Sequence, residues 1–144
     1  DSSVLYRNKG DWRFQNVTSE TDIKSQKTYQ GAWGDFNNDG YPDLVTDGKL
    51  YQNPGGDNNW LKVEVEGSKN ANRSAIGAQV RIKLGDKTLT RQVESSTGQG
   101  NQNEMKLLFG LGSYNEKLDV QVRWPDGKVK NYRVKSNRVL HARE

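Results

Sequence analysis

The chain has 144 residues, a length that suits one compact domain or two very small ones. Hydrophobic residues make up 31% of it, and no apolar run approaches the roughly 18 residues that a membrane-spanning helix needs. Cysteine is absent, which excludes disulfides, thiolate metal sites and a cysteine nucleophile. The only histidine, His141, stands near the end of the chain without a motif around it, so the sequence does not favour a Ser-His-Asp triad.

The net charge of +4 is divided unevenly along the chain. Residues 1–59 hold six Lys/Arg against nine Asp/Glu, whereas residues 60–144 hold sixteen against nine. An acidic first half suits a bound cation. A basic second half suits an anionic partner such as a polysaccharide, although lysines scattered over exposed strand faces explain the same count. The charge changes near the polar, glycine-containing segment 55–59, so we predict two parts, 1–56 and 57–144.

Two segments of the first half have similar sequences. Residues 4–10 read Val-Leu-Tyr-Arg-Asn-Lys-Gly and residues 49–55 read Lys-Leu-Tyr-Gln-Asn-Pro-Gly, an offset of 45 residues. A period of about 40 to 50 residues is typical of propeller blades and related arrays. One blade alone cannot bury both faces of its sheet. We therefore expect either further blades in a longer chain or a blade that packs on the second half.

A short loop inside the repeated unit alternates oxygen-bearing residues: Asp35, Asn37, Asp39, Tyr41 and Asp43. Calcium prefers six to eight oxygen ligands, and Gly40 lets the loop bend tightly enough for these oxygens to converge. Thr46 stands where an EF-hand needs a glutamate, and the flanking residues have the pattern of strand ends rather than helices. We predict a calcium loop between two strands of a blade. An Asx-rich turn without a metal is the alternative.

The second half alternates apolar and polar residues, which predicts six or seven short strands. The expected strands are 60–66, 78–84, 88–94, 105–111, 118–124, 128–134 and 137–142. Asp126-Gly127 predicts a hairpin turn, and the continuous apolar run 105–111 predicts a strand buried on both faces. No helix is expected. The predicted fold class is all-β: one propeller-blade-like calcium repeat packed on, or followed by, a small β-sandwich or barrel.

A nine-residue loop of small polar residues forms a second candidate site. Its candidate ligand-contacting residues are Ser95, Ser96, Thr97, Gln99, Asn101, Gln102 and Asn103. They offer many hydrogen-bond donors and acceptors without bulk, but a surface loop shaped by its glycines has the same composition. The four tryptophans are predicted to pack in the core rather than to form sugar-stacking platforms: Trp12, Trp33, Trp60 and Trp124.

Residues 4–56 resemble the FG-GAP/VCBS repeat of integrin propellers and many bacterial surface proteins, most clearly over residues 29–40, Tyr-Gln-Gly-Ala-Trp-Gly-Asp-Phe-Asn-Asn-Asp-Gly. The resemblance implies that the five loop residues hold a structural calcium ion.

Residues 59–134 resemble the ASPIC/UnbV domain, which often follows such repeats in cartilage acidic protein and its bacterial relatives. The matching motifs are Asn59-Trp60-Leu61, Ala75-Ile76-Gly77-Ala78, Ser95-Ser96-Thr97-Gly98, Leu108-Phe109-Gly110-Leu111-Gly112 and Val122-Arg123-Trp124-Pro125-Asp126-Gly127. Gln99 stands where the family often has an aromatic residue, so a ligand contact at this loop does not carry over from the family.

These features predict a non-catalytic, calcium-binding extracellular module for adhesion, assembly or protein–protein interaction, within a larger surface or secreted protein. A glycan-binding module of such a protein is the alternative. The expected partner is a protein or glycan at the cell surface, and self-assembly stays open. Catalysis is not favoured, because the clustered acids are assigned to the metal loop and no G-x-S-x-G motif is present. The basic segment 128–135 has no helix-turn-helix or RNA-recognition pattern, so nucleic acid binding is not favoured either.

Overall fold

The computed structural model describes residues 3–24, 28, 30–68 and 72–144, and its regular structure is nearly all β-strand. The described residues contain no α-helix and one 3-10 turn, η1 (Thr18–Glu20). No helix among them is long and apolar enough to cross a membrane. The predicted all-β class is therefore confirmed.

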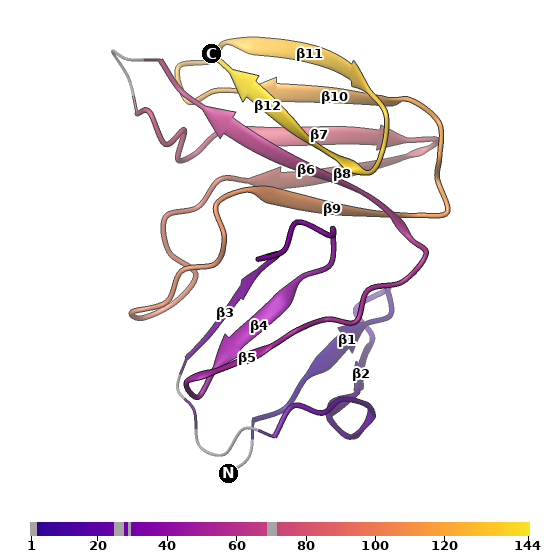
Figure 1. Cartoon of the computed structure of the whole chain (residues 1–144). Coiled ribbons are helices and arrows are strands. Elements are labelled where there is room, and N and C mark those ends of the chain that lie inside the picture. The colour runs from indigo at the N-terminus through magenta and orange to yellow at the C-terminus, as the bar shows by residue number, and fades with distance from the viewer. Residues whose placement is uncertain (1–2, 25–27, 29, 69–71) are drawn as a thin grey trace.

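Two packed sheets make up the second part of the chain. Their strands are β6 (Asn59–Glu66), β7 (Gln79–Leu84), β8 (Lys87–Gln92), β9 (Leu107–Gly112), β10 (Leu118–Arg123), β11 (Val129–Val134) and β12 (Arg138–Arg143). One sheet has the order β11-β10-β7-β8 and the other β12-β6-β9, with β12 parallel to β6 (Figure 1). In the described part of the chain neither sheet closes into a barrel, so the predicted strands form a β-sandwich.

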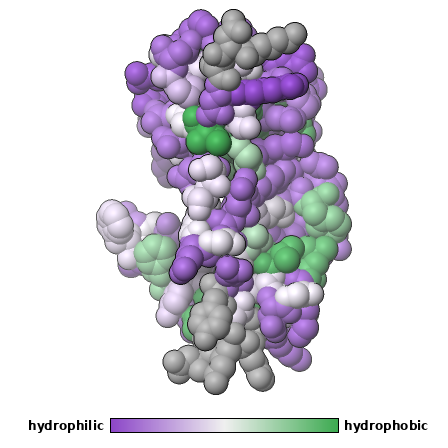
Figure 2. Space-filling model, turned by 90° about the vertical axis from the view of Figure 1, so that its left-hand side faces the viewer, coloured by the Kyte–Doolittle hydropathy of each residue, from purple (hydrophilic) through white to green (hydrophobic). Residues whose placement is uncertain are grey.

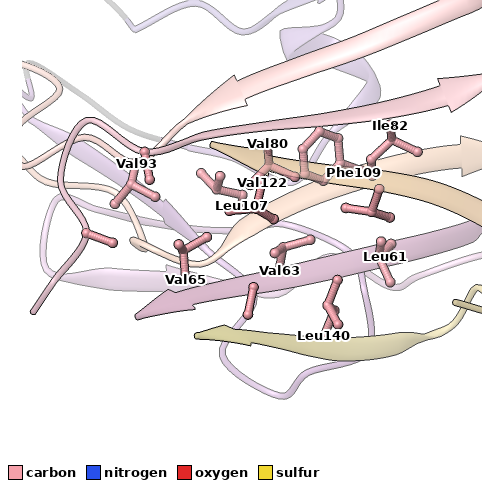
Figure 3. Close-up of a cluster of buried hydrophobic side chains, with 14 of the residues drawn as sticks. Leu61, Val63, Val65, Val80, Ile82, Val93, Leu107, Phe109, Val122 and Leu140 are labelled. Atoms are coloured by element: carbon pink, nitrogen blue, oxygen red, sulfur yellow. The ribbon is translucent and has the colours of Figure 1, made fainter. Parts of the chain in front are cut away.

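The core lies between these two sheets and follows directly from alternation along the strands. Leu61, Val63 and Val65 of β6 point toward Val80 and Ile82 of β7, and all five side chains are buried (Figure 3). Full burial of such a side chain contributes about 1.5–3 kcal/mol. Burial of these apolar side chains therefore holds the two sheets together.

One strand differs from its prediction. The apolar run 105–111 was expected to be buried on both faces, but β9 is an edge strand of the three-stranded sheet. Its burial alternates: Phe109 and Leu111 are buried, whereas Gly110 and Gly112 are exposed. The expectation is wrong because only Leu107, Phe109 and Leu111 face the core; on the other face Leu108 is half-buried and Gly110 has no side chain.

The first part of the chain forms two small sheets, which Figure 1 shows below the sandwich. Their strands are β1 (Tyr6–Asn8), β2 (Phe14–Asn16), β3 (Gly31–Gly34), β4 (Asp43–Thr46) and β5 (Lys49–Tyr51). β1 and β2 form a hairpin, while β3, β4 and β5 form an antiparallel sheet in chain order. Each copy of the repeated sequence thus contributes a strand, β1 or β5.

The tryptophans do not share the core environment that was predicted for them. Trp124 is 1% exposed, and its indole N–H donates to the carbonyl of Glu66 at 3.0 Å. Trp12 is 95% exposed in the β1–β2 turn, where its φ is +59°, and Trp33 is 37% exposed. The prediction of core packing holds for Trp124, whereas Trp60 is only half-buried. It is wrong for Trp12, which lies in the turn before β2 begins at Phe14, and for the exposed Trp33 of β3.

The second face of the three-stranded sheet is covered by the repeat. Lys62 of β6 points away from the sandwich core, yet its side chain is fully buried. Its ammonium contacts the loop between β3 and β4. The candidate site therefore lies where the two parts of the chain meet.

Candidate functional site

The loop between β3 and β4 begins and ends on a buried carboxylate. Asp35 is 3% exposed and Asp43 is 2% exposed. Asp35 accepts the backbone N–H of Asp39 on Oδ1 and that of Gly40 on Oδ2, each at 3.0 Å. Asp43 accepts the backbone N–H of Phe36 at 3.1 Å on Oδ2. These bonds tie the loop to its own two ends, which is how a nine-residue segment keeps one conformation.

The middle of the loop is organised by two more of the predicted residues. Asp39 Oδ1 accepts the backbone N–H of Tyr41 at 2.8 Å, and Asp39 Oδ2 accepts from the side-chain amide of Asn37 at 2.7 Å. Asn37 Oδ1 in turn accepts the backbone N–H of Asp39 at 3.3 Å. The structure thus brings the five predicted residues together on one compact loop.

A buried lysine from the sandwich completes this loop. The Lys62 ammonium lies 3.0 Å from Asp35 Oδ2 and 3.1 Å from Glu104 Oε1. It also donates to the carbonyl of Asp35 and to Asn38 Oδ1, both at 3.0 Å. A buried charge is tolerated only when it is paired and hydrogen-bonded, and Lys62 meets both conditions. Removing it would leave Asp35 charged and buried.

Sequence reasoning did not identify Lys62 or Glu104. Strand alternation placed Lys62 on the face of β6 opposite the core, where a lysine is normally solvated. Its burial depends on the loop that contains Asp35, 27 residues earlier in the chain. The signal that could have found it is a lysine between Leu61 and Val63, in the first strand after the repeat that contains the acidic loop.

The donors of this loop suit a hard cation such as calcium, because they are three carboxylates, an amide oxygen and a backbone carbonyl. Two carboxylates, those of Asp35 and Glu104, contact the buried Lys62 ammonium, while the Asp39 and Asp43 carboxylates accept backbone N–H groups of the loop. Yet no three acidic or histidine side chains among the described residues lie close enough together to hold a metal as they stand. Calcium at this loop is compatible with the donor chemistry and stays a prediction.

The candidate ligand loop 95–103 lies against the open edge of β3 (Figure 1). Asn101 donates its side-chain amide to the carbonyl of Gly31 at 2.7 Å, and Asn103 Oδ1 accepts the backbone N–H of Trp33 at 2.9 Å. The next residue, Glu104, donates its backbone N–H to the carbonyl of Trp33 at 2.8 Å. This loop therefore covers a strand edge, which would otherwise present unpaired backbone groups.

Most other residues of this loop are exposed, and two of them also make hydrogen bonds within the loop. Ser96 Oγ donates to the carbonyl of Gly98 at 2.9 Å, and the Thr97 N–H donates to the carbonyl of Asn101 at 3.0 Å. The residues that face solvent are Ser95, Ser96, Thr97, Gln99 and Gln102. Asn101 and Asn103 are half-buried, so the structure separates them from the exposed candidate contacts.

The repeat also contacts the sandwich through Gly40, whose φ is +89°. A Cβ at this position would overlap the indole ring of Trp60. Trp60 belongs to β6, so the loop between β3 and β4 packs directly on the strand that carries Lys62. Glycine is required at this position both for the left-handed backbone and for the close approach.

Two family profiles match the chain. A profile described as ASPIC and UnbV matches residues 67–144, and one described as FG-GAP-like repeat matches residues 1–46. Neither a search of curated proteins nor a search of solved structures returned a match. The two-part architecture that the sequence motifs indicated is confirmed.

Replacing Lys62 with methionine is expected to lower the free energy of unfolding by about 3–5 kcal/mol, because it leaves a buried carboxylate without its partner. The control is Lys106→Met, since Lys106 makes only a partly exposed pair with Glu64 at 3.9 Å. That variant should lose less than about 1 kcal/mol. Urea denaturation measures both, and equal losses would contradict the role of Lys62.

Gly40→Ala is expected to destabilise the chain more than Gly48→Ala. Both glycines have positive φ, but space around Gly48 is open, whereas a Cβ at Gly40 meets Trp60. Forcing a methyl group into a packed contact costs about 1–3 kcal/mol beyond the shared backbone strain. The melting temperatures of the two variants separate the cost of the contact with Trp60 from the cost of the positive φ, which both variants share. Equal losses would show that Trp60 does not pack on the loop.

Proposed function

The chain belongs to the ASPIC and UnbV family, and on that premise we propose that it is a non-catalytic, calcium-binding module for adhesion, assembly or protein–protein interaction. Its FG-GAP-like repeat is of a type that typically occurs in extracellular or surface proteins, so the chain is a β module of extracellular type. The partner in this proposal is a protein or a glycan at the cell surface.

The observation that carries the calcium proposal is the charge at the loop. Two of its carboxylates, Asp35 and Asp43, are almost fully buried, and Lys62 is the ammonium that pairs with Asp35. Buried carboxylates are costly unless their charge is balanced. Bound calcium would supply the missing positive charge, with the Asp35, Asn37, Asp39 and Asp43 side chains and the Tyr41 carbonyl as its ligands.

A structural role fits this location better than a signalling role. The loop joins two paired strands, and its bonds to Lys62 and Glu104 reach the sandwich. A cation at this loop would stabilise the folded state, because the unfolded chain does not assemble the same ligands. We therefore assign the proposed metal ligands of the loop to holding the module together, and recognition to other side chains.

Exposed apolar side chains on the repeat support the protein-partner part of the proposal. Trp33, Phe36, Val45 and Leu50 are 37%, 56%, 50% and 50% exposed, and they border a hollow of about 520 Å³. Figure 2 shows hydrophobic groups on the surface of the lower half of the view, where the repeat lies. Contiguous exposed apolar surface of this kind often marks an interaction site.

The environment of His141 supports the non-catalytic part of the proposal. Its side chain is 64% exposed, and its Nδ1 lies 2.9 Å from Glu64 Oε2. A catalytic histidine would be expected beside a nucleophile in a site that excludes water. His141 instead belongs to an exposed pair between the neighbouring strands β12 and β6.

Glycan binding is the second candidate function. It is favoured by the outer face of the four-stranded sheet, which presents amides, hydroxyls and basic groups to solvent. Such groups pair with the hydroxyls and acidic substituents of sugars. This candidate is independent of calcium, so the two can be tested separately.

Calcium is expected to raise the melting temperature of chelator-treated protein. At a free concentration 100 times the dissociation constant, the gain in unfolding free energy is about 2.7 kcal/mol. Asp39→Ala should remove most of that gain, because it deletes one predicted ligand. Lys62 does not contact Asp39, so the variant leaves the ion pairs of Lys62 in place. The control is Asp57→Ala, which changes the charge equally at an exposed residue outside the loop. The absence of a calcium-dependent shift in the wild type would refute the metal site.

A further inference from the structure

The outer face of the four-stranded sheet is built from three rows of side chains that strand register aligns. The first row holds Arg133, Asp119, Lys83 and Thr88 from β11, β10, β7 and β8 in turn. The second row holds Asn131, Gln121, Arg81 and Thr90, and the third holds Val129, Arg123, Gln79 and Gln92. Directly opposed residues share a face, so these side chains form one continuous surface.

This surface is basic and polar. It contains four basic side chains, Arg81, Lys83, Arg123 and Arg133, against one acid, Asp119. Asp119 lies 3.8 Å from Arg133, and both side chains are largely exposed. The basic groups recur in every row, at the spacing of about 6.8 Å that separates alternate residues of a strand. An extended anionic chain could therefore meet a cation at each row.

The neutral residues of the face are suited to sugars. The side-chain amide of Gln79 donates to Gln92 Oε1, and that of Gln121 donates to Asn131 Oδ1, each at 3.3 Å. These bonds orient the amides along the rows while leaving further donors and acceptors for a ligand. A hollow of about 570 Å³ lies over the first two rows. Val129 is the one apolar residue of the three rows, so the surface does not favour an apolar partner.

We propose that this face binds an anionic polysaccharide, with Arg81, Lys83 and Arg123 pairing with its sulfate or carboxylate groups. Charge-assisted hydrogen bonds to such groups are stronger than neutral ones. Nucleic acid fits the face less well. The described residues contain no α-helix that could enter a DNA groove, and no aromatic side chain stands in the three rows for bases to stack on. The proposal gives the second candidate function its ligand class and its residues.

Binding of the full chain to immobilised heparin and to polygalacturonate distinguishes sulfated from carboxylated ligands. Dextran serves as the neutral polysaccharide, and random-sequence double-stranded DNA as the alternative polyanion. The wild type should bind at least one of the two acidic polysaccharides, with an affinity that falls as salt rises. It should bind dextran weakly or not at all.

The variant Arg81→Gln/Lys83→Gln/Arg123→Gln removes three exposed charges from the face and should weaken that binding about tenfold or more. The control Lys9→Gln/Lys24→Gln/Lys49→Gln removes three exposed charges from the repeat and should change it less than about threefold. The proposal would be overturned if the wild type bound neither acidic polysaccharide, or bound DNA as tightly as the polysaccharides. It would also be overturned if the first variant kept its affinity, or if the control lost as much affinity as the first variant. These measurements in chelator do not depend on calcium, so their failure leaves the metal proposal to its own test.

Discussion

A buried ammonium must be surrounded by acceptors, and the acceptors of Lys62 come from both parts of the chain. Asp35 and Asn38 belong to the repeat, while Glu104 belongs to the segment before β9 of the sandwich. Because no one element supplies all of them, the charge of Lys62 can be satisfied only when the loop, β6 and residue 104 are in place together. The repeat and the sandwich therefore depend on each other for stability.

Contacts with the sandwich also stabilise the repeat. A blade has two apolar faces to bury and two edge strands whose backbone groups need partners. The sandwich covers part of a face and part of an edge. Trp60 packs against Gly40 of the loop, and Asn101 and Asn103 bind the edge of β3. Functional surface is left elsewhere, on the outer face of the four-stranded sheet and on the exposed side of the repeat.

Local pattern predicted much of this structure, because strand alternation and turn residues act over a few neighbours. The strands of the sandwich and the loop from Asp35 to Asp43 appear where the sequence placed them. Lys62 and the edge-covering role of Asn103 could not be predicted in that way, since each depends on a partner far along the chain. The polar composition of the loop around Asn103 suits a ligand and a strand edge equally well, and only the fold distinguishes them.

Native-state hydrogen exchange of the wild-type chain tests most directly whether the two parts form one unit. The backbone amide of Gly40 binds Asp35 Oδ2 inside the buried network, and the amides of β6 lie in the central strand of the three-stranded sheet. If Lys62 joins the two parts, these amides should exchange with similar opening free energies. Rapid exchange at Gly40 while β6 stays protected would show that the repeat opens alone and would contradict this account.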